Sequence, residues 1–297
     1  MSRAESVGVE AAGLRLRATL SGAGPPLLVL HGFTGCADSM EGIATGLSDA
    51  YRTLRLDLVG HGGSDAPDSV AAYTMESCVE QVASALDALG VRTAHVIGYS
   101  MGGRVALALC AWRPERVRSA LLVGASAGLE HPDRRAARRR ADEALAARIE
   151  SEGLERFVDE WMGRPLFAGQ RRLGQAALAR ARAQRLANRP RGLANSLRGM
   201  GAGAQPALHP LLERIRTPLR LVAGSQDAKF VAIASDLARR LPNARVRLVP
   251  GAGHACHLEA PATFLGIARR FLADVEASRR TPARVASAST VQPEGTP

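Results

Sequence analysis

Cysteine and aromatic residues are scarce in this chain of 297 residues, and each scarcity excludes a class of protein. The four cysteines lack the paired spacing of a zinc site or a disulfide framework, so we expect reduced thiols and no metal. Aromatic residues make up 4% of the chain, too few for the stacking platforms that bind single-stranded nucleic acid. No apolar run approaches the roughly 20 residues that cross a bilayer, and the N-terminus lacks the layout of a secretory signal. The sequence therefore predicts a cytoplasmic protein without a membrane span.

The formal net charge of +11 comes from the part of the chain after residue 130. Residues 1–130 carry 10 basic and 13 acidic groups, whereas residues 131–191 carry 15 basic and 8 acidic groups. A nucleic-acid footprint would combine a basic face with a recognisable binding motif, and no such motif is present. We therefore expect no nucleic-acid partner.

Apolar runs of strand length alternate with helical patterns, which is typical of a mostly parallel sheet with helices on both faces. The expected strands cover residues 25–30, 51–57, 94–98, 120–124, 217–224 and 244–250, and clear helical patterns cover residues 77–89 and 104–112. The alternation stops over residues 126–216, which are helical in pattern and rich in Arg and Ala. We predict a core of residues 1–125 and 217–277, a helical lid inserted over 126–216, and a disordered tail over 278–297.

The segment Gly98-Tyr-Ser-Met-Gly102 matches the Gly-x-Ser-x-Gly nucleophile elbow and stands between a predicted strand and a predicted helix. The sharp turn needs glycine on both sides of the serine, because larger side chains would collide with the strand and the helix. Such a turn exposes Ser100 and directs the backbone N–H of Met101 toward a developing oxyanion. The loop His31-Gly-Phe-Thr-Gly35 follows the first predicted strand, and the N–H of Phe33 is the second candidate donor.

A histidine on a late loop has to serve as the base that activates Ser100. His254 follows the last predicted strand, within a loop of small residues at the sheet edge where the elbow lies. His257 could lie nearby but has no turn residues that place it. His31 and His61 stand on loops near the site, where structural or pocket roles suit them better.

A carboxylate has to orient that histidine, and two strand ends could supply it. The strand over 120–124 is followed by Ala-Ser-Ala-Gly, without a carboxylate, whereas the strand over 217–224 is followed by Ser-Gln-Asp227. Asp227 is therefore the candidate acid. The chain order Ser100, Asp227, His254 is that of the α/β-hydrolase fold.

These motifs resemble a family more specific than the fold. Together with Gly60-His-Gly-Gly-Ser64, Asp227-Ala-Lys-Phe230 and the segment from Gly251 to Glu259, they are similar to the 2-succinyl-6-hydroxy-2,4-cyclohexadiene-1-carboxylate synthases of menaquinone biosynthesis. The resemblance covers roughly residues 25–272. It implies an α/β-hydrolase fold and a cofactor-free lyase that eliminates pyruvate from 2-succinyl-5-enolpyruvyl-6-hydroxy-3-cyclohexene-1-carboxylate, with proton abstraction by the Ser-His-Asp triad.

The resemblance also implies residues that bind a substrate with several carboxylates, which guanidinium groups pair through two parallel hydrogen bonds. By matching position, these residues are Tyr99, Arg104, Arg138, Trp161 and Arg185. Arg104 stands one helical turn from Ser100, so its side chain can reach the same cleft. For Arg138 and Arg185 a solvated helix face is the alternative, as it is for neighbours such as Arg139 and Arg172, which we expect to face solvent.

Two other functions remain open from the residues alone. A serine carboxylesterase or C–C bond hydrolase of the same fold would use Ser100 as a true nucleophile. A non-catalytic receptor on this fold would need no triad, and the complete triad argues against it. Arg104 and the basic lid favour the lyase.

Overall fold

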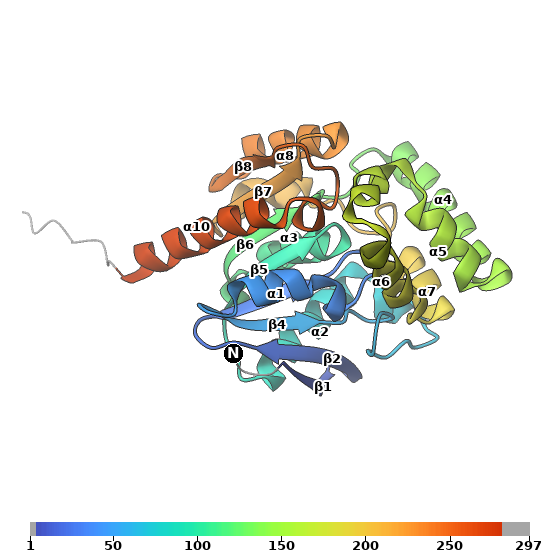
Figure 1. The fold of residues 1–297 in the computed structure, drawn as a ribbon, viewed down its shortest axis with the longest axis horizontal. Helices are drawn as coiled ribbons and strands as arrows, with labels where there is room; N and C mark the ends of the chain where they lie inside the picture. Colours follow the sequence, from blue (N-terminus) through green and yellow to red (C-terminus); the bar gives the residue numbers. More distant parts are fainter. Residues whose placement is uncertain (1–3, 281–297) are drawn as a thin grey trace, which may run out of the picture.

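A computed structural model describes residues 4–280, and an eight-stranded sheet forms its centre (Figure 1). The strand order is β1-β2-β4-β3-β5-β6-β7-β8; β2 is antiparallel to β1 and β4, and all other neighbours are parallel. The strands are β1 (Glu5–Ala11), β2 (Leu14–Ser21), β3 (Pro26–Leu30), β4 (Arg52–Leu56), β5 (Ala94–Tyr99), β6 (Val117–Val123), β7 (Leu219–Gly224) and β8 (Ala244–Val249). Each of the six predicted strands coincides with one of β3 to β8.

Helices cover both faces of this sheet. The α-helices are α1 (Glu41–Leu47), α2 (Met75–Ala88), α3 (Met101–Trp112), α4 (Pro132–Glu152), α5 (Leu154–Met162), α6 (Gln175–Leu186), α7 (Pro190–Met200), α8 (Ala228–Arg240), α9 (Cys256–Glu259) and α10 (Pro261–Arg280). Along β3, Leu28 and Leu30 join the core beneath α2 and α3, whereas Leu27 and Val29 join the core beneath α1 and α10. Burial of successive residues on opposite faces explains why β3 is a continuous apolar run. The predicted mostly parallel sheet, covered on both faces, is confirmed.

The strands β1 and β2 form an antiparallel hairpin at one edge of the sheet, where no element was predicted. Ala12 and Gly13 make the connecting turn, with φ of +49° and +80°. The hairpin alternates between buried and exposed residues, since only one of its faces packs on the core. The apolar residues of the hairpin are small or stand between arginine and glutamate residues. A search for continuous apolar runs therefore does not detect these two strands.

Residues 126–216, which we call the lid, contain α4 to α7 and lie beyond one end of the sheet (Figure 1). Their buried apolar side chains form a small core of their own, made by Ala146, Ile149, Phe157, Val158, Leu193, Ala194 and Leu197. Phe33, which belongs to the loop after β3, packs against this core. The lid is therefore fixed to the sheet domain at the loop predicted to carry an oxyanion donor.

The end of the described chain is helical where a tail was predicted to begin. α10 continues to Arg280, and the remainder of the predicted tail, residues 281–297, lies outside the described residues. Within residues 4–280 no helix has both the length and the apolar character needed to cross a membrane. The four cysteines, Cys36, Cys78, Cys110 and Cys256, are free thiols and are buried.

Candidate active site

Ser100 stands at the turn between β5 and α3. Its φ is +52°, a left-handed conformation that costs a residue with a side chain about 1–3 kcal/mol. A Cβ at Gly98 would lie 2.4 Å from the carbonyl oxygen of Gly102, and a Cβ at Gly102 would lie 2.4 Å from that of Leu30. The backbone N–H of Ser100 donates to the carbonyl oxygen of Val123 at 2.8 Å, which ties the turn to the neighbouring strand. The two glycines therefore allow a strained turn that the sheet then holds in place.

His254 joins Ser100 to Asp227. Its Nδ1 lies 2.7 Å from Oδ2 of Asp227, and its Nε2 lies 3.2 Å from Oγ of Ser100. The side chains of His254 and Asp227 are 1% and 8% exposed, so the pair is shielded from water. In the tautomer protonated at Nδ1, Nδ1–H donates to the carboxylate and Nε2 accepts from the hydroxyl. This arrangement allows His254 to take a proton from Ser100 while Asp227 stabilises the resulting imidazolium.

The strand ends and the surrounding rings fix both partners of Ser100. Asp227 caps α8, and its Oδ1 accepts from the backbone N–H of Phe230 at 3.3 Å. The ring of Phe230 lies 4.5 Å from the imidazole of His254, and the ring of Tyr99 lies 5.4 Å from it, between centroids. The imidazole is thus confined between aromatic faces.

The two predicted oxyanion donors lie on either side of the elbow. Met101 begins α3, and Phe33 lies in the loop after β3, which is tied to α3 by a 3.0 Å hydrogen bond from Gly102 N–H to the carbonyl of His31. Among residues 4–280, neither the N–H of Phe33 nor that of Met101 takes part in a turn, loop or cap hydrogen bond. Both donors are therefore available to a ligand at Ser100.

The other histidines near the site are packed as neutral rings. Nδ1–H of His31 donates to the carbonyl of Gly32 at 2.8 Å, and its Nε2 accepts from Leu58 N–H at 3.0 Å. Burial, and then the charge of the nearby His31 and His254 respectively, lowers the pKa of His61 and of His257 to about 3. The ring of His257 packs on Tyr99 at 4.5 Å. These contacts suit structural roles for all three side chains.

A cavity of about 1080 Å³ opens over Ser100 and His254, between the elbow, the lid and α8. All five side chains that the resemblance implied as substrate ligands line it. Its charge is strongly positive, since seven basic side chains line it together with two carboxylates: Arg104, Arg134, Arg138, Arg148, Arg164, Arg185, Lys229, Asp142 and Asp236. Five arginines of the lid therefore line the cavity that opens over the candidate catalytic serine.

Arg104 and Arg185 enter this cavity without a carboxylate partner among the described residues. Nη1 of Arg104 donates to the carbonyl of Met200 at 2.6 Å and to Oε1 of Gln205. Burial, and then the charge of Arg138, lowers the pKa of Arg104 to about 10, so it remains a cation at neutral pH. Nη1 of Arg185 donates to the carbonyl of Ala181 at 2.8 Å, while its Nε is buried without a partner. Burial lowers the pKa of Arg185 as well.

Arg138 and Trp161 differ from these two cations. Nε of Arg138 donates to Oδ1 of Asp142, four residues along α4, at 2.8 Å, and its side chain is 43% exposed. Its charge is therefore balanced within its own helix. Nε1–H of Trp161 is buried without a hydrogen-bond partner, and its ring packs on Phe33 at 5.3 Å, with the guanidinium of Arg164 at 4.5 Å. Trp161 offers a donor and an apolar wall.

Two arginines expected to face solvent are exposed and also donate hydrogen bonds to the backbone. Nε of Arg139 donates to the carbonyl of Gly203 at 2.9 Å. Nη2 of Arg172 donates to the carbonyl of Gly251 at 2.9 Å and lies 3.5 Å from Oε2 of Glu259. Both residues are exposed, as expected, and these hydrogen bonds are additional contacts, made where the lid folds back on itself at Gly203 and packs against the loop of His254.

The sequence patterns missed two buried polar side chains that shape the site. Asp57 is fully buried, and its carboxylate accepts from the N–H groups of Ala37 and, at 2.8 Å, Gly63. Oδ1 of Asn188 accepts from Gly62 N–H at 2.9 Å, and its Nδ2 donates to the carbonyl of Thr34 at 2.9 Å. Asp57 has a sequence signal, since it ends a predicted strand. Asn188 has none, because its two partners in the sheet domain, Gly62 and Thr34, lie more than 120 residues away.

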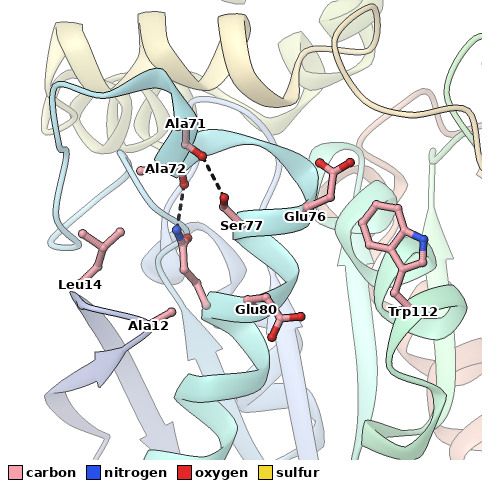
Figure 2. Close-up of a pocket in the computed structure, with 9 residues that line it drawn as sticks. Ala12, Leu14, Ala71, Ala72, Glu76, Ser77, Glu80 and Trp112 are labelled. Atoms are coloured by element: carbon pink, nitrogen blue, oxygen red, sulfur yellow. Dashed lines mark hydrogen bonds between the residues drawn. The ribbon is translucent and has the colours of Figure 1, made fainter.

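A second cavity, of about 860 Å³, lies between the β1–β2 turn, α2 and Trp112 (Figure 2). Ser77 Oγ donates there to the carbonyl of Ala71 at 2.8 Å, and Gln81 Nε2 donates to that of Ala72 at 2.8 Å. These polar groups thus bind the backbone, and the residues that line the cavity include no histidine. The candidate chemistry is confined to the cavity over Ser100.

Comparison with known proteins agrees with this geometry. The family model described as "alpha/beta hydrolase fold" matches residues 25–261. A Bacillus subtilis (strain 168) protein, provisionally named as a 2-succinyl-6-hydroxy-2,4-cyclohexadiene-1-carboxylate synthase, is 40% identical over 84% of this chain and 90% of its own length. The synthase of that name from Serratia proteamaculans (strain 568) is 32% identical over 84% of this chain and 93% of its own. The structure of MenH from S. aureus superimposes with a TM-score of 0.83 at 29% identity, covering 88% of this chain and 98% of that one. The residues that match the family model include Ser100, Asp227 and His254.

Proposed function

This chain belongs to the alpha/beta hydrolase fold family, and we propose that within it the chain is the lyase that forms 2-succinyl-6-hydroxy-2,4-cyclohexadiene-1-carboxylate. Relatives that carry the name of this synthase support an enzyme of menaquinone biosynthesis. The proposed substrate, 2-succinyl-5-enolpyruvyl-6-hydroxy-3-cyclohexene-1-carboxylate, loses pyruvate in the reaction.

The first step is removal of the ring proton next to the ketone of the succinyl group. His254 Nε2 accepts the proton of Ser100 Oγ, and the serine oxygen takes the ring proton, while Asp227 stabilises the imidazolium through Nδ1–H. The C–H electron pair moves toward the ketone oxygen, which becomes negatively charged. The N–H groups of Phe33 and Met101 stabilise this oxyanion.

The second step expels the leaving group. The electron pair returns through the ring, two conjugated double bonds form, and the C–O bond to the enolpyruvyl group breaks. The enolpyruvate leaves and takes up a proton at its methylene carbon, which gives pyruvate. Water is not a reactant, and no acyl-enzyme forms.

The substrate has three carboxylates, and the cavity offers fixed cations for them. Arg104 and Arg185 lack a carboxylate partner in the described chain, and a buried cation without a counter-ion is costly. An anionic ligand offsets that cost. Arg138 keeps its Nη groups for a further carboxylate while Nε binds Asp142, and Tyr99 and Trp161 line the same space. The observation that carries the proposal is this one: the contact between Ser100 and His254 opens into a cavity with unpaired guanidinium groups.

The test is incubation of the purified protein with the proposed substrate while pyruvate release is measured. We expect pyruvate and the cyclohexadiene product in equal amounts, and loss of both in Ser100→Ala. Absence of pyruvate from a folded wild-type protein would overturn the proposal.

A serine hydrolase is the second candidate, because the same contacts and the same N–H donors fit nucleophilic attack by Ser100. It predicts rapid hydrolysis of a neutral aryl ester with a burst from an acyl-enzyme. The lyase predicts slow turnover of that ester and no burst, since a neutral ester leaves Arg104 and Arg185 without a partner.

A further inference from the structure

The loop that carries His254 is made almost entirely of small residues, and one buried carboxylate holds it. Glu259 ends α9, and its side chain is 1% exposed. Its Oε2 accepts from Gly253 N–H at 2.8 Å, and its Oε1 accepts from Ala255 N–H at 3.3 Å. These two N–H groups belong to the residues on either side of His254. The carboxylate therefore fixes the backbone from which the catalytic imidazole projects.

The lid reaches the same carboxylate through η4 (Pro165–Leu173). The backbone of Gly169 lies so close that a Cβ there would come within 1.9 Å of Oε2 of Glu259. Nη2 of Arg172 lies 3.5 Å from that oxygen and donates to the carbonyl of Gly251 at 2.9 Å. It also lies 3.4 Å from Oε1 of Gln226, the residue before Asp227. Arg172 thus contacts the loop of the base, the loop of the acid and the carboxylate that fixes the base.

We propose that Glu259 is the positioning residue for His254, and that Arg172 extends this positioning to the lid. A buried carboxylate is stable only when it is fully hydrogen-bonded, and two N–H groups and a guanidinium supply those bonds here. Two further hydrogen bonds anchor this loop, from Gly251 N–H to Oγ of Ser225 and from Gln226 N–H to the carbonyl of Ala252, each at 2.9 Å, but neither reaches the residues directly beside His254. A shift of about 1 Å in a catalytic group can cost on the order of 10²-fold in rate. The contacts of Glu259 and Arg172 therefore affect the chemical step. This positioning role rests on the proposed function only in that the kcat measurement uses the proposed lyase reaction.

The central test is the Glu259→Gln variant, whose amide presents an N–H₂ to one of the two backbone N–H groups. We expect kcat to fall by roughly 10- to 100-fold. KM should stay within about twofold of the wild-type value, since the arginines proposed to bind the substrate are unchanged. Arg172→Ala is expected to lower kcat less, by roughly 3- to 10-fold, and Arg172→Lys to recover part of the loss. The matched control is Arg171→Ala, an exposed neighbour, which should leave kcat and KM unchanged.

Two readouts do not depend on the pathway substrate. The downfield proton resonance of the hydrogen bond between His254 and Asp227 should broaden or move in Glu259→Gln, and a fluorophosphonate should label Ser100 more slowly. Both effects, in variants whose thermal unfolding matches wild type, support positioning. A normal kcat in a folded Glu259→Gln, a change confined to KM, or equal behaviour of Arg172→Ala and Arg171→Ala would each overturn it. If wild type releases no pyruvate while labelling of Ser100 still depends on Glu259, the lyase fails and the positioning role stands.

Discussion

In the proposed mechanism Ser100, His254 and Asp227 act as one unit, because each contact is useful only if the other is made. Asp227 without His254 orients nothing, and His254 without Ser100 has no group to activate. Ser100→Ala, His254→Ala and Asp227→Asn should each lower kcat by at least ~10³-fold, and the double variants should lose little more. Steady-state kinetics on variants with unchanged circular dichroism checks this. Near-normal turnover in any of the three would contradict the role assigned to that residue.

Arg104 is a half-buried cation held by a carbonyl and an amide rather than by a carboxylate. A guanidinium that pairs a carboxylate in such a site is worth about 1.5–3 kcal/mol. Arg104→Ala should therefore lower kcat/KM by roughly 10- to 100-fold, and Arg104→Lys should recover little because the two-point geometry is lost. The control is Arg140→Ala, on the exposed side of α4. Equal behaviour of the two alanine variants would show that Arg104 has no special partner.

Residues placed by local turn chemistry were the ones that sequence alone could identify. Gly98 and Gly102 mark the turn of Ser100, and strand ends mark Asp227 and His254, so their positions follow from short segments. Arg172 contacts its partners because the lid packs on a loop 79 residues further along the chain. No local sequence pattern predicts such a contact. For this reason the contacts of Arg172 were not predicted, although its exposure was.

At the scale of elements, the connection between α6 and α7 links the lid to two loops of the sheet domain. Asn188 is 5% exposed there, accepting from Gly62 N–H and donating to the carbonyl of Thr34. Asn188→Ala would leave both backbone groups unpaired, which typically costs about 1–3 kcal/mol in the free energy of unfolding. Urea unfolding measures this, with Gln175→Ala on the exposed start of α6 as the control. Equal midpoints for the two variants would rule out the link.

Elements were predictable to the extent that their apolar pattern was complete. β3 and β5 are buried on both faces and read as apolar runs, whereas β1 and β2 have one exposed face and were missed. α3 begins at Met101, three residues before the predicted start, because the elbow forces the helix to begin at a pair of glycines with poor intrinsic helix propensity. Helical pattern in the lid was clear, but which of its arginines face the cavity depends on how α4 to α7 pack.

For the whole molecule, buried neutral histidines make stability depend on pH. Burial lowers the pKa of His61 and His257 to about 3 from the ordinary value of 6.5, so between these values the unfolded chain binds more protons than the folded one. Their contribution is fully present above about pH 6.5 and is lost progressively as the pH falls toward 3. The free energy of unfolding should therefore fall from pH 7 to pH 4.5.

His257→Gln tests this dependence. The variant should reduce the slope of the free energy of unfolding against pH by up to the contribution of one proton, about 1.4 kcal/mol per pH unit. Urea unfolding at a series of pH values measures this slope. The control is His131→Gln, at an exposed position before α4, which should leave the slope as it is. An unchanged slope in His257→Gln would contradict a neutral buried imidazole at that position.

The central claim is that the triad removes a proton from the substrate and that water is not a reactant. The most direct measurement is one complete turnover of 2-succinyl-5-enolpyruvyl-6-hydroxy-3-cyclohexene-1-carboxylate in ¹⁸O-labelled water, with mass spectrometry of the products and unlabelled product incubated alongside to correct for exchange. The account predicts pyruvate and the cyclohexadiene carboxylate in equal amounts, with no water-derived oxygen in the diene beyond that correction. Water-derived oxygen in the ring product, or consumption of the substrate without pyruvate, would contradict it.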